Sequence, residues 1–343
     1  MFTKPGDLPE SAIAGALKHH WGFGAASLVY QAVGFGSHHW LATDRTGHRL
    51  FVTADDLGAK LHTVRDTPEE AFKRLSSAFE TARALRSDAG LSFVIAPVPT
   101  SDGKVVAWLS DRYSLVVHPY VAGEPAGQDG QFAKDEDRRT VVDMLIQIHG
   151  AHVIGARADD FVVPKLDSLQ ALIDQTGAEW GPGPYARPAK DLLEAHVRDL
   201  TALIQAYQNM ASRVAARQER MVVTHGEPHA SNVIATGEGL VLVDWDTTLL
   251  APPERDLSHL ADDDPSVLHH YANATGTEID SEALAMYRLW WDLCEIAGYL
   301  VLFRAPHDND ADTRESWSEL RHYLPPAARW SALVQAHRVS NTS

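Results

Sequence analysis

Cysteine is nearly absent from this chain of 343 residues, which has a single one, Cys294. An internal disulfide is therefore excluded, and the apolar, tryptophan-rich surroundings of Cys294 predict a buried packing residue, not a nucleophile. Long apolar runs are lacking too. No stretch approaches the roughly 18 apolar residues of a membrane span, and the N-terminus lacks the apolar core of a signal peptide. We therefore expect a cytoplasmic protein without a membrane partner.

Positive charge is scarce as well. Lys and Arg total 30 against 46 Asp and Glu, for a formal net charge of −16. Such a chain repels nucleic acid, so no nucleic-acid partner is expected. The acidic surface is consistent with a cationic small-molecule substrate or with solubility alone. Nothing in the sequence points to a particular oligomeric state.

The order of predicted elements indicates an α+β fold with two lobes. Three β-like runs joined by tight connections predict an antiparallel meander, followed by a long helix and three more short strands. These strands are expected at residues 26–35, 38–43, 49–53, 93–97, 105–110 and 114–119, and the helix at 68–89. Beyond a Gly- and Asp-rich linker at 123–130 the pattern is mainly helical. We predict a small sheet-containing lobe over residues 1–121 and a larger helical lobe over 122–343.

The chemistry is concentrated in residues 221–260. A buried apolar run at 240–243 ends at Asp244, and a turn at 236–239 would bring Asn232 back beside that carboxylate. Two hard oxygen ligands suit Mg²⁺ completed by water and nucleotide phosphates. The alternative is a hydrogen-bonded loop and a helix cap. A zinc site with His225 and His229 is less well supported, because no third soft ligand is evident.

A second group of polar residues suggests an acceptor site. Asp292 and Glu295 are three residues apart on a predicted helix, and with the acidic run that includes Asp262 they could form an acidic wall for a cationic substrate. The run could equally be a solvated turn. Trp291 adjoins Asp292 and is the better stacking candidate, although a core position is the alternative. His229 could contact substrate or phosphate, or only hydrogen-bond within its loop.

The motif HGEPHASN followed by LVDWD resembles the catalytic and metal-binding loops of the aminoglycoside phosphotransferases, whose pattern is H-G-D-x-x-x-x-N and then I-D-W-D/E. The downstream APPERDL is nearest to the spectinomycin-phosphotransferase-like branch. The resemblance implies a bilobal protein-kinase-like fold and an O-phosphotransferase. It implies Glu227 as catalytic base, Asn232 and Asp244 as Mg²⁺ ligands, and Asp256 as a brace of the catalytic loop. His225 is expected to order the same loop through hydrogen bonds.

The same resemblance implies the donor and acceptor. ATP or GTP would supply the phosphoryl group to a hydroxyl of a small polar, cationic molecule such as an aminoglycoside, an aminocyclitol or a nucleoside antibiotic, giving resistance or self-protection. YSLVVHPYVAGEP resembles the hinge that holds the purine, around His118 and Tyr120. Gly36 and Ser37 resemble a glycine-poor loop over the nucleotide.

Two residues depart from the family pattern. Glu227 replaces the usual Asp, and Thr53 stands where the phosphate-binding lysine is usual. Threonine brings no charge, so Lys60, Lys73 or a second metal ion would have to supply it. The alternative function is accordingly a kinase-like pseudoenzyme that binds nucleotide or a small ligand without phosphorylating it. Nucleotidyl transfer is a third possibility.

Overall fold

The computed structural model describes residues 1–261, 264, 266–326 and 329–333, and the contacts within the chain divide it into two units. The first unit comprises Met1–Lys60, Thr67–Asp159 and Gln218–Leu284. The second comprises Leu61–Asp66, Asp160–Arg217 and Ala285–Ser343. The first unit runs through residue 121, so the lobe boundary expected there stays a prediction. Within the described residues no helix is long and apolar enough to cross a membrane.

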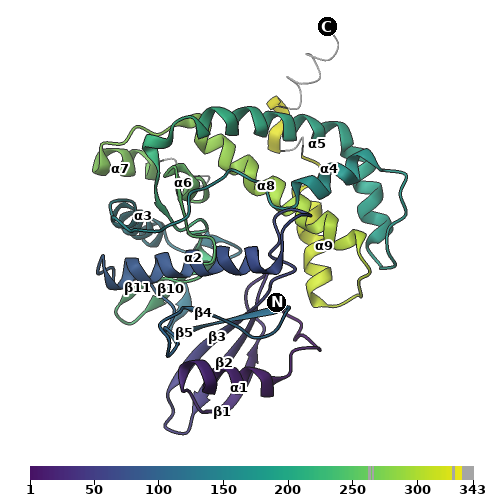
Figure 1. The fold of residues 1–343 in the computed structure, drawn as a ribbon. Coiled ribbons are helices and arrows are strands. Elements are labelled where there is room, and N and C mark those ends of the chain that lie inside the picture. The colour runs from purple at the N-terminus through teal and green to yellow at the C-terminus, as the bar shows by residue number, and fades with distance from the viewer. Residues whose placement is uncertain (262–263, 265, 327–328, 334–343) are drawn as a thin grey trace. The chain divides into compact units, whose positions relative to one another are not determined.

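The first unit begins with a five-stranded antiparallel sheet in the order β1-β2-β3-β5-β4 (Figure 1). Its strands are β1 (Ala25–Gln31), β2 (His38–Asp44), β3 (Arg49–Asp56), β4 (Val106–Trp108) and β5 (Tyr113–Pro119), and its helices are α1 (Glu10–Trp21) and α2 (Pro68–Ser87). Helix α2 starts at a capping box in which Thr67 and Glu70 satisfy each other's backbone N–H groups. The antiparallel meander and the long helix predicted from the sequence are present.

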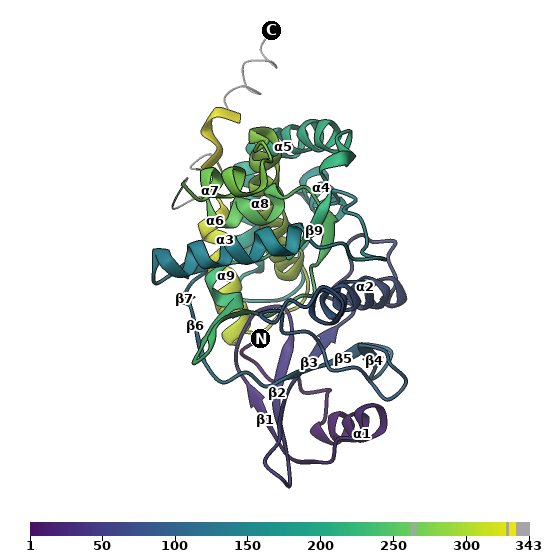
Figure 2. The same ribbon diagram turned by 90° about the vertical axis from the view of Figure 1, so that its left-hand side faces the viewer.

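Alternation along the strands gives the two faces of this sheet different partners. Leu50, Val52 and Ala54 of β3 are buried in one core cluster with Ile13 and Leu17 of α1. The intervening residues of β3 therefore face the other side, where the β5 residue His118 packs edge-on against Phe79 of α2 at 5.6 Å between ring centroids. Helices α1 and α2 thus lie on opposite faces of the sheet (Figure 2).

The rest of the first unit is built from short strands and helices. These are β6 (Glu124–Pro125), β7 (Gly127–Gln128), β8 (Gln131–Phe132), α3 (Asp135–His149), η1 (Gln218–Arg220), β9 (Val222–Thr224), η2 (Ala230–Asn232), β10 (Val233–Thr236), β11 (Gly239–Leu242), β12 (Leu249–Ala251), α6 (Glu254–Leu260) and α7 (Ser266–Thr275). The expected linker at 123–130 therefore contains two short strands. The strand expected at 93–97 is absent, and the segment makes one isolated parallel bridge between Val94 and Leu242. The reason is that the segment hydrogen-bonds to the end of β11 and does not join the five-stranded sheet.

The second unit is helical. It contains α4 (Leu166–Asp174), α5 (Ala186–Ala215), most of α8 (Ser281–Arg304) and α9 (Ala311–Tyr323). Its fully buried residues include Leu169, Leu200 and Leu293, and burying such a side chain stabilises the fold by about 1.5–3 kcal/mol. Cys294, predicted to be buried, is only half-buried on α8. The small antiparallel sheet and the mainly helical remainder confirm the α+β fold class.

Candidate active site

The loop between β9 and β10 and the hairpin that follows it bring the predicted metal ligands together. In the hairpin Val233 pairs with Leu242, and the Val243 N–H donates to the Asn232 carbonyl at 3.0 Å. Asp244 follows immediately, so Asn232 and Asp244 lie at the open end of one hairpin, one position out of register. The Asn232 side-chain amide donates to the Glu227 carbonyl at 3.0 Å, which ties this end of the loop to the position expected for the base.

Asp244 combines an unusual backbone with an unfavourable electrostatic setting. Its φ is +64°, a left-handed conformation that Asp adopts more readily than most residues, and its side chain is exposed to solvent. Desolvation by the surrounding protein, followed by the charges of Asp246 and Glu227, raises the pKa of Asp244 well above its ordinary value, and Lys60 only partly offsets this. A bound cation would reduce the repulsion between this solvent-exposed carboxylate and its negatively charged neighbours.

The donor set fits Mg²⁺ better than it fits a metal enclosed by protein. Among the described residues no three His, Cys, Asp or Glu side chains are grouped so as to hold a metal ion. Mg²⁺ is commonly held by one or two protein oxygens together with waters and substrate phosphates. Asn232 and Asp244 are such a pair.

Glu227 lies in the same loop with its side chain 29% exposed. Burial alone would raise its pKa, but His229, whose Nε2 lies 3.7 Å from Oε2, together with His259 and His225 outweighs burial and lowers the pKa to about 2. Glu227 is therefore a carboxylate at neutral pH and able to accept a hydrogen bond from a hydroxyl. The ring of His259 lies 6.2 Å from that of His229, and burial lowers the pKa of His259 to about 4.

Backbone hydrogen bonds hold this loop from two sides. His225 donates from Nε2 to the Val243 carbonyl at 2.9 Å and accepts at Nδ1 from the Glu227 N–H at 3.2 Å. This pattern requires a neutral ring, and burial lowers the pKa of His225 accordingly. Asp256 of α6 accepts from the backbone N–H groups of His225 and Gly226 at 2.9 and 2.6 Å. These are the contacts that the predicted supporting roles of His225 and Asp256 require.

A further residue that the sequence did not single out completes the support. His149 at the end of α3 lies with Nε2 3.1 Å from the Asp256 carboxylate and with Nδ1 2.8 Å from the Tyr271 hydroxyl. Burial alone would raise the pKa of Asp256, but the hydrogen bond with His149, together with the nearby Arg255 guanidinium, keeps it below its usual value. The only sequence signal was the histidine closing the apolar run VVDMLIQIH.

Replacing Asp256 by asparagine is expected to lower the free energy of unfolding by about 1–3 kcal/mol, because a buried charged acceptor of two N–H groups is lost. Turnover is expected to fall by about tenfold to a hundredfold as the loop shifts. Denaturant unfolding and steady-state rates measure both effects. The matched control is Asp111→Asn, at an exposed position in the same unit. Unchanged unfolding in the Asp256 variant would contradict the supporting role.

The predicted nucleotide residues gather on the α2 face of the sheet. Thr53 is buried on β3, pairs with His39 and Val116 on the adjacent strands, and shares a 3.1 Å hydrogen bond with His39. His118 pairs with the neighbouring position Phe51, and burial lowers the pKa of His118 to about 4, which leaves the ring neutral.

The remaining residues predicted to bind nucleotide lie in the Gly36–Ser37 loop and in the expected hinge at Tyr120. Gly36 has φ +91°, and the hydroxyl of the next residue, Ser37, donates to the buried Asp55 carboxylate at 2.6 Å. Tyr120 lies under the Arg49 guanidinium, 4.0 Å from the ring centroid. Asp55 and Asp246 were not assigned roles from the sequence. The acidic pair ending RLFVTADD and the second acid of DWD were the available signals.

The predicted acceptor residues are divided between the units. His229 belongs to the loop between β9 and β10, whereas Trp291, Asp292 and Glu295 lie on α8 in the second unit. Asp262 lies outside the described residues. Within their own unit these side chains already have partners. Trp291 donates to the Tyr323 hydroxyl of α9 at 3.0 Å, and the Glu295 carboxylate adds to burial in raising the pKa of Tyr299 on the same helix.

Asp292 is buried and already has cationic and N–H partners. Arg329 Nε lies 3.2 Å from its carboxylate, and the Trp330 indole donates to it at 2.7 Å. An acceptor that bound Asp292 would have to replace these contacts.

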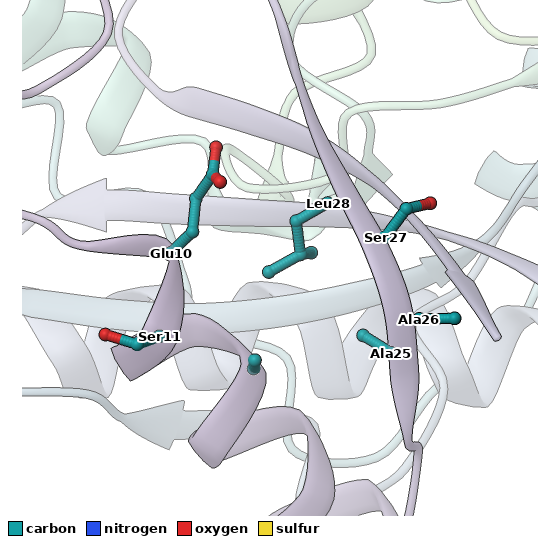
Figure 3. Close-up of a pocket in the computed structure, with 7 residues that line it drawn as sticks. Glu10, Ser11, Ala25, Ala26, Ser27 and Leu28 are labelled. Carbon is teal, nitrogen blue, oxygen red and sulfur yellow. The ribbon is translucent and has the colours of Figure 1, made fainter.

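A small pocket between α1 and β1 contains none of the predicted site residues (Figure 3). Its lining includes Glu10, whose carboxylate already binds Lys4 at 2.6 Å, and small residues of β1. This pocket is not part of the site.

Comparison with known proteins finds related sequences. The sequence model described as the phosphotransferase enzyme family matches residues 40–290. Protein StrN of Streptomyces griseus is 32% identical over 254 residues, which cover 70% of this chain and 74% of StrN.

Solved structures share the fold at low sequence identity. Spectinomycin phosphotransferase, in complex with ADP and spectinomycin, has a TM-score of 0.69 at 17% identity and covers 92% of this chain and 94% of its own. An amicoumacin kinase in complex with AMP-PNP and Ca²⁺ has a TM-score of 0.59 at 14% identity, with 92% of each chain covered. The expected kinase-like fold is confirmed.

Proposed function

The chain belongs to the phosphotransferase enzyme family, and from that membership we propose that it transfers the terminal phosphoryl group of ATP or GTP, with Mg²⁺, to a hydroxyl of a cationic aminocyclitol or aminoglycoside antibiotic. That it is a phosphotransferase acting on hydroxyl groups follows from the family match. The observation that carries the site assignment is the hairpin that presents Asn232 and the solvent-exposed Asp244 beside Glu227.

Each residue of the loop has a defined task in this proposal. Mg²⁺ held by Asn232 and Asp244 would neutralise charge on the phosphate oxygens. The ionised Glu227 accepts the hydrogen bond of the acceptor hydroxyl and orients its oxygen toward the terminal phosphorus. As the new P–O bond forms, the bond to the bridging oxygen breaks, the nucleoside diphosphate leaves and the hydroxyl proton passes to Glu227.

The acceptor class is proposed from charge and from the relatives. The net charge of −16 favours a cationic molecule, and the structure with a TM-score of 0.69 is that of a spectinomycin phosphotransferase. We place His229 at the acceptor hydroxyl because it lies beside Glu227. Trp291, Glu295 and Asp262 are proposed as further acceptor contacts, and Asp292 as one that requires displacement of Arg329.

Calorimetric titration with non-hydrolysable ATP and GTP analogues, each with and without Mg²⁺, tests the donor half of the proposal. We expect binding of one analogue to tighten by about tenfold or more with Mg²⁺, since the phosphates and the Asp244 carboxylate repel each other without a cation. No binding of either analogue would contradict the proposal and favour the pseudoenzyme alternative.

Mass spectrometry of candidate acceptors tests the other half. Spectinomycin and other cationic aminocyclitols are incubated with enzyme, nucleotide and Mg²⁺. Addition of one phosphoryl group is expected, whereas addition of a nucleotidyl group would replace the proposed reaction by nucleotidyl transfer.

A further inference from the structure

Thr53 leaves the predicted nucleotide face without a cation at the position where the family has lysine. Its hydroxyl is already hydrogen-bonded to His39. Arg49, on the same face of β3, is stacked on Tyr120, and four strand residues place it roughly 13 Å from Thr53. Lys73 is exposed on α2, with no ion pair to the site carboxylates among the described contacts. None of these residues brings charge to the phosphate position.

Lys60 brings that charge from the segment after β3. Its Nζ lies 2.7 Å from the Asp246 carboxylate and 3.6 Å from that of Asp55, with 24% of the side chain exposed. Asp55 is two residues beyond Thr53 on the same strand face and is also bound by Ser37. A side chain at Gly36 would begin only 4.0 Å from Nζ. The ammonium is thus located between the Gly36–Ser37 loop and the DWD carboxylates.

The main chain of Lys60 is anchored, so this position is preorganised. Its N–H donates to the Asp56 carbonyl at 3.2 Å, and its carbonyl accepts from the Arg74 guanidinium at 3.0 Å. An ammonium has three N–H donors, and the contacts here are to two carboxylates, which leaves a donor for a third oxygen. The neighbouring Asp246, Asp55 and Asp244 carboxylates also raise the pKa of Lys60 despite its burial, so the group stays charged.

We propose that Lys60 is the phosphate-binding cation of this enzyme, held by Asp55 and Asp246 and acting on the β- and γ-phosphates in place of a lysine at Thr53. In protein kinases the phosphate-binding lysine is itself oriented by a carboxylate partner. Here the partners are Asp55, two residues beyond Thr53 on β3, and Asp246 of the proposed metal-binding segment. The assignment rests on the proposed nucleotide-dependent function and explains how Thr53 is compatible with it.

The test compares how variants bind two nucleotides of the preferred base, in the presence of Mg²⁺. The ligands are the non-hydrolysable triphosphate analogue and the monophosphate, which lacks the phosphates that Lys60 would contact. Lys60→Met is expected to weaken binding of the triphosphate analogue by about tenfold to a hundredfold, the range for a charge-assisted hydrogen bond. The affinity for the monophosphate is expected to stay within about twofold of the wild-type value. Lys73→Met is the matched control, and both its affinities are expected to stay unchanged.

A rescue variant separates phosphate binding from a purely structural ion pair. Adding Thr53→Lys to Lys60→Met is expected to restore at least about tenfold of the triphosphate affinity, because a lysine would return to the same strand face. Unchanged triphosphate binding in Lys60→Met, or equal loss for both nucleotides without rescue, would overturn the proposal. If Lys60→Met does not fold, Lys60→Gln is measured in its place. Absence of nucleotide binding by the wild type would instead refute the proposed function itself.

Discussion

Replacing Asp244 by asparagine is expected to lower the rate of phosphoryl transfer by about a thousandfold or more, while the protein remains folded. Asparagine keeps the size of the side chain and tolerates the left-handed backbone at φ +64°. It removes the only negative charge of the proposed metal pair, so charge on the transferring phosphoryl group would go uncompensated. Mg²⁺-dependent tightening of the triphosphate analogue should disappear in the same variant.

The same substitution is expected to leave stability unchanged or slightly higher at neutral pH. Because the folded-state pKa of Asp244 is raised, its ionised form destabilises the fold relative to its protonated form, so this effect is small near pH 4 and grows as the pH rises toward the folded-state pKa. Because the side chain is exposed to solvent, we expect the gain at pH 7 to stay under about 1 kcal/mol. The free energy of unfolding at pH 4 and pH 7 measures this gain, with Glu238→Gln at the exposed hairpin turn as control.

Near wild-type turnover in Asp244→Asn would refute the metal assignment.

Replacing Glu227 by glutamine is expected to reduce kcat by about a hundredfold to ten-thousandfold, the usual contribution of a positioned acid–base group. Nucleotide affinity should stay within about twofold, because Glu227 is assigned to the acceptor hydroxyl. Since its pKa is lowered to about 2, Glu227 should contribute no acidic limb to the rate profile above about pH 4. Steady-state kinetics with the identified acceptor measure each quantity.

Glu227→Asp distinguishes a site whose geometry requires glutamate from one whose geometry still suits aspartate. Shortening the side chain withdraws the carboxylate by about 1 Å, which is expected to cost on the order of a hundredfold in rate. A rate above that of the wild type would show that the acceptor geometry still suits aspartate. Glu238→Gln serves again as the variant with unchanged rate, since its position is exposed and outside the loop.

The local parts of the site were predictable from the sequence, whereas contacts between distant segments were not. The hairpin followed from a turn between two apolar runs, which is a short-range pattern, and it placed Asn232 opposite Val243. The choice between Lys60 and Lys73 could not be made in the same way, because Lys60 meets Asp246 across 186 positions of the chain. The role of His149 depends on Asp256, which lies 107 positions away.

The strand expected at residues 93–97 was wrong for a related physical reason. Apolar composition predicts that a segment is buried but not which neighbour it pairs with. Here the neighbour is Leu242 of the β10–β11 hairpin, with which the segment forms a single bridge. This segment therefore lies beside the last residue of β11, two positions before Asp244.

The left-handed backbone of Asp244 has a consequence for how this enzyme can lose its activity. Aspartate and asparagine codons differ by one base, and asparagine is among the few residues that accept such a backbone without strain. A single transition at the first codon position would therefore give a descendant that is expected to fold but, on the proposed metal assignment, to transfer phosphate about a thousandfold more slowly. In homologues, residue 244 is the position to read first when active genes are to be separated from silent copies.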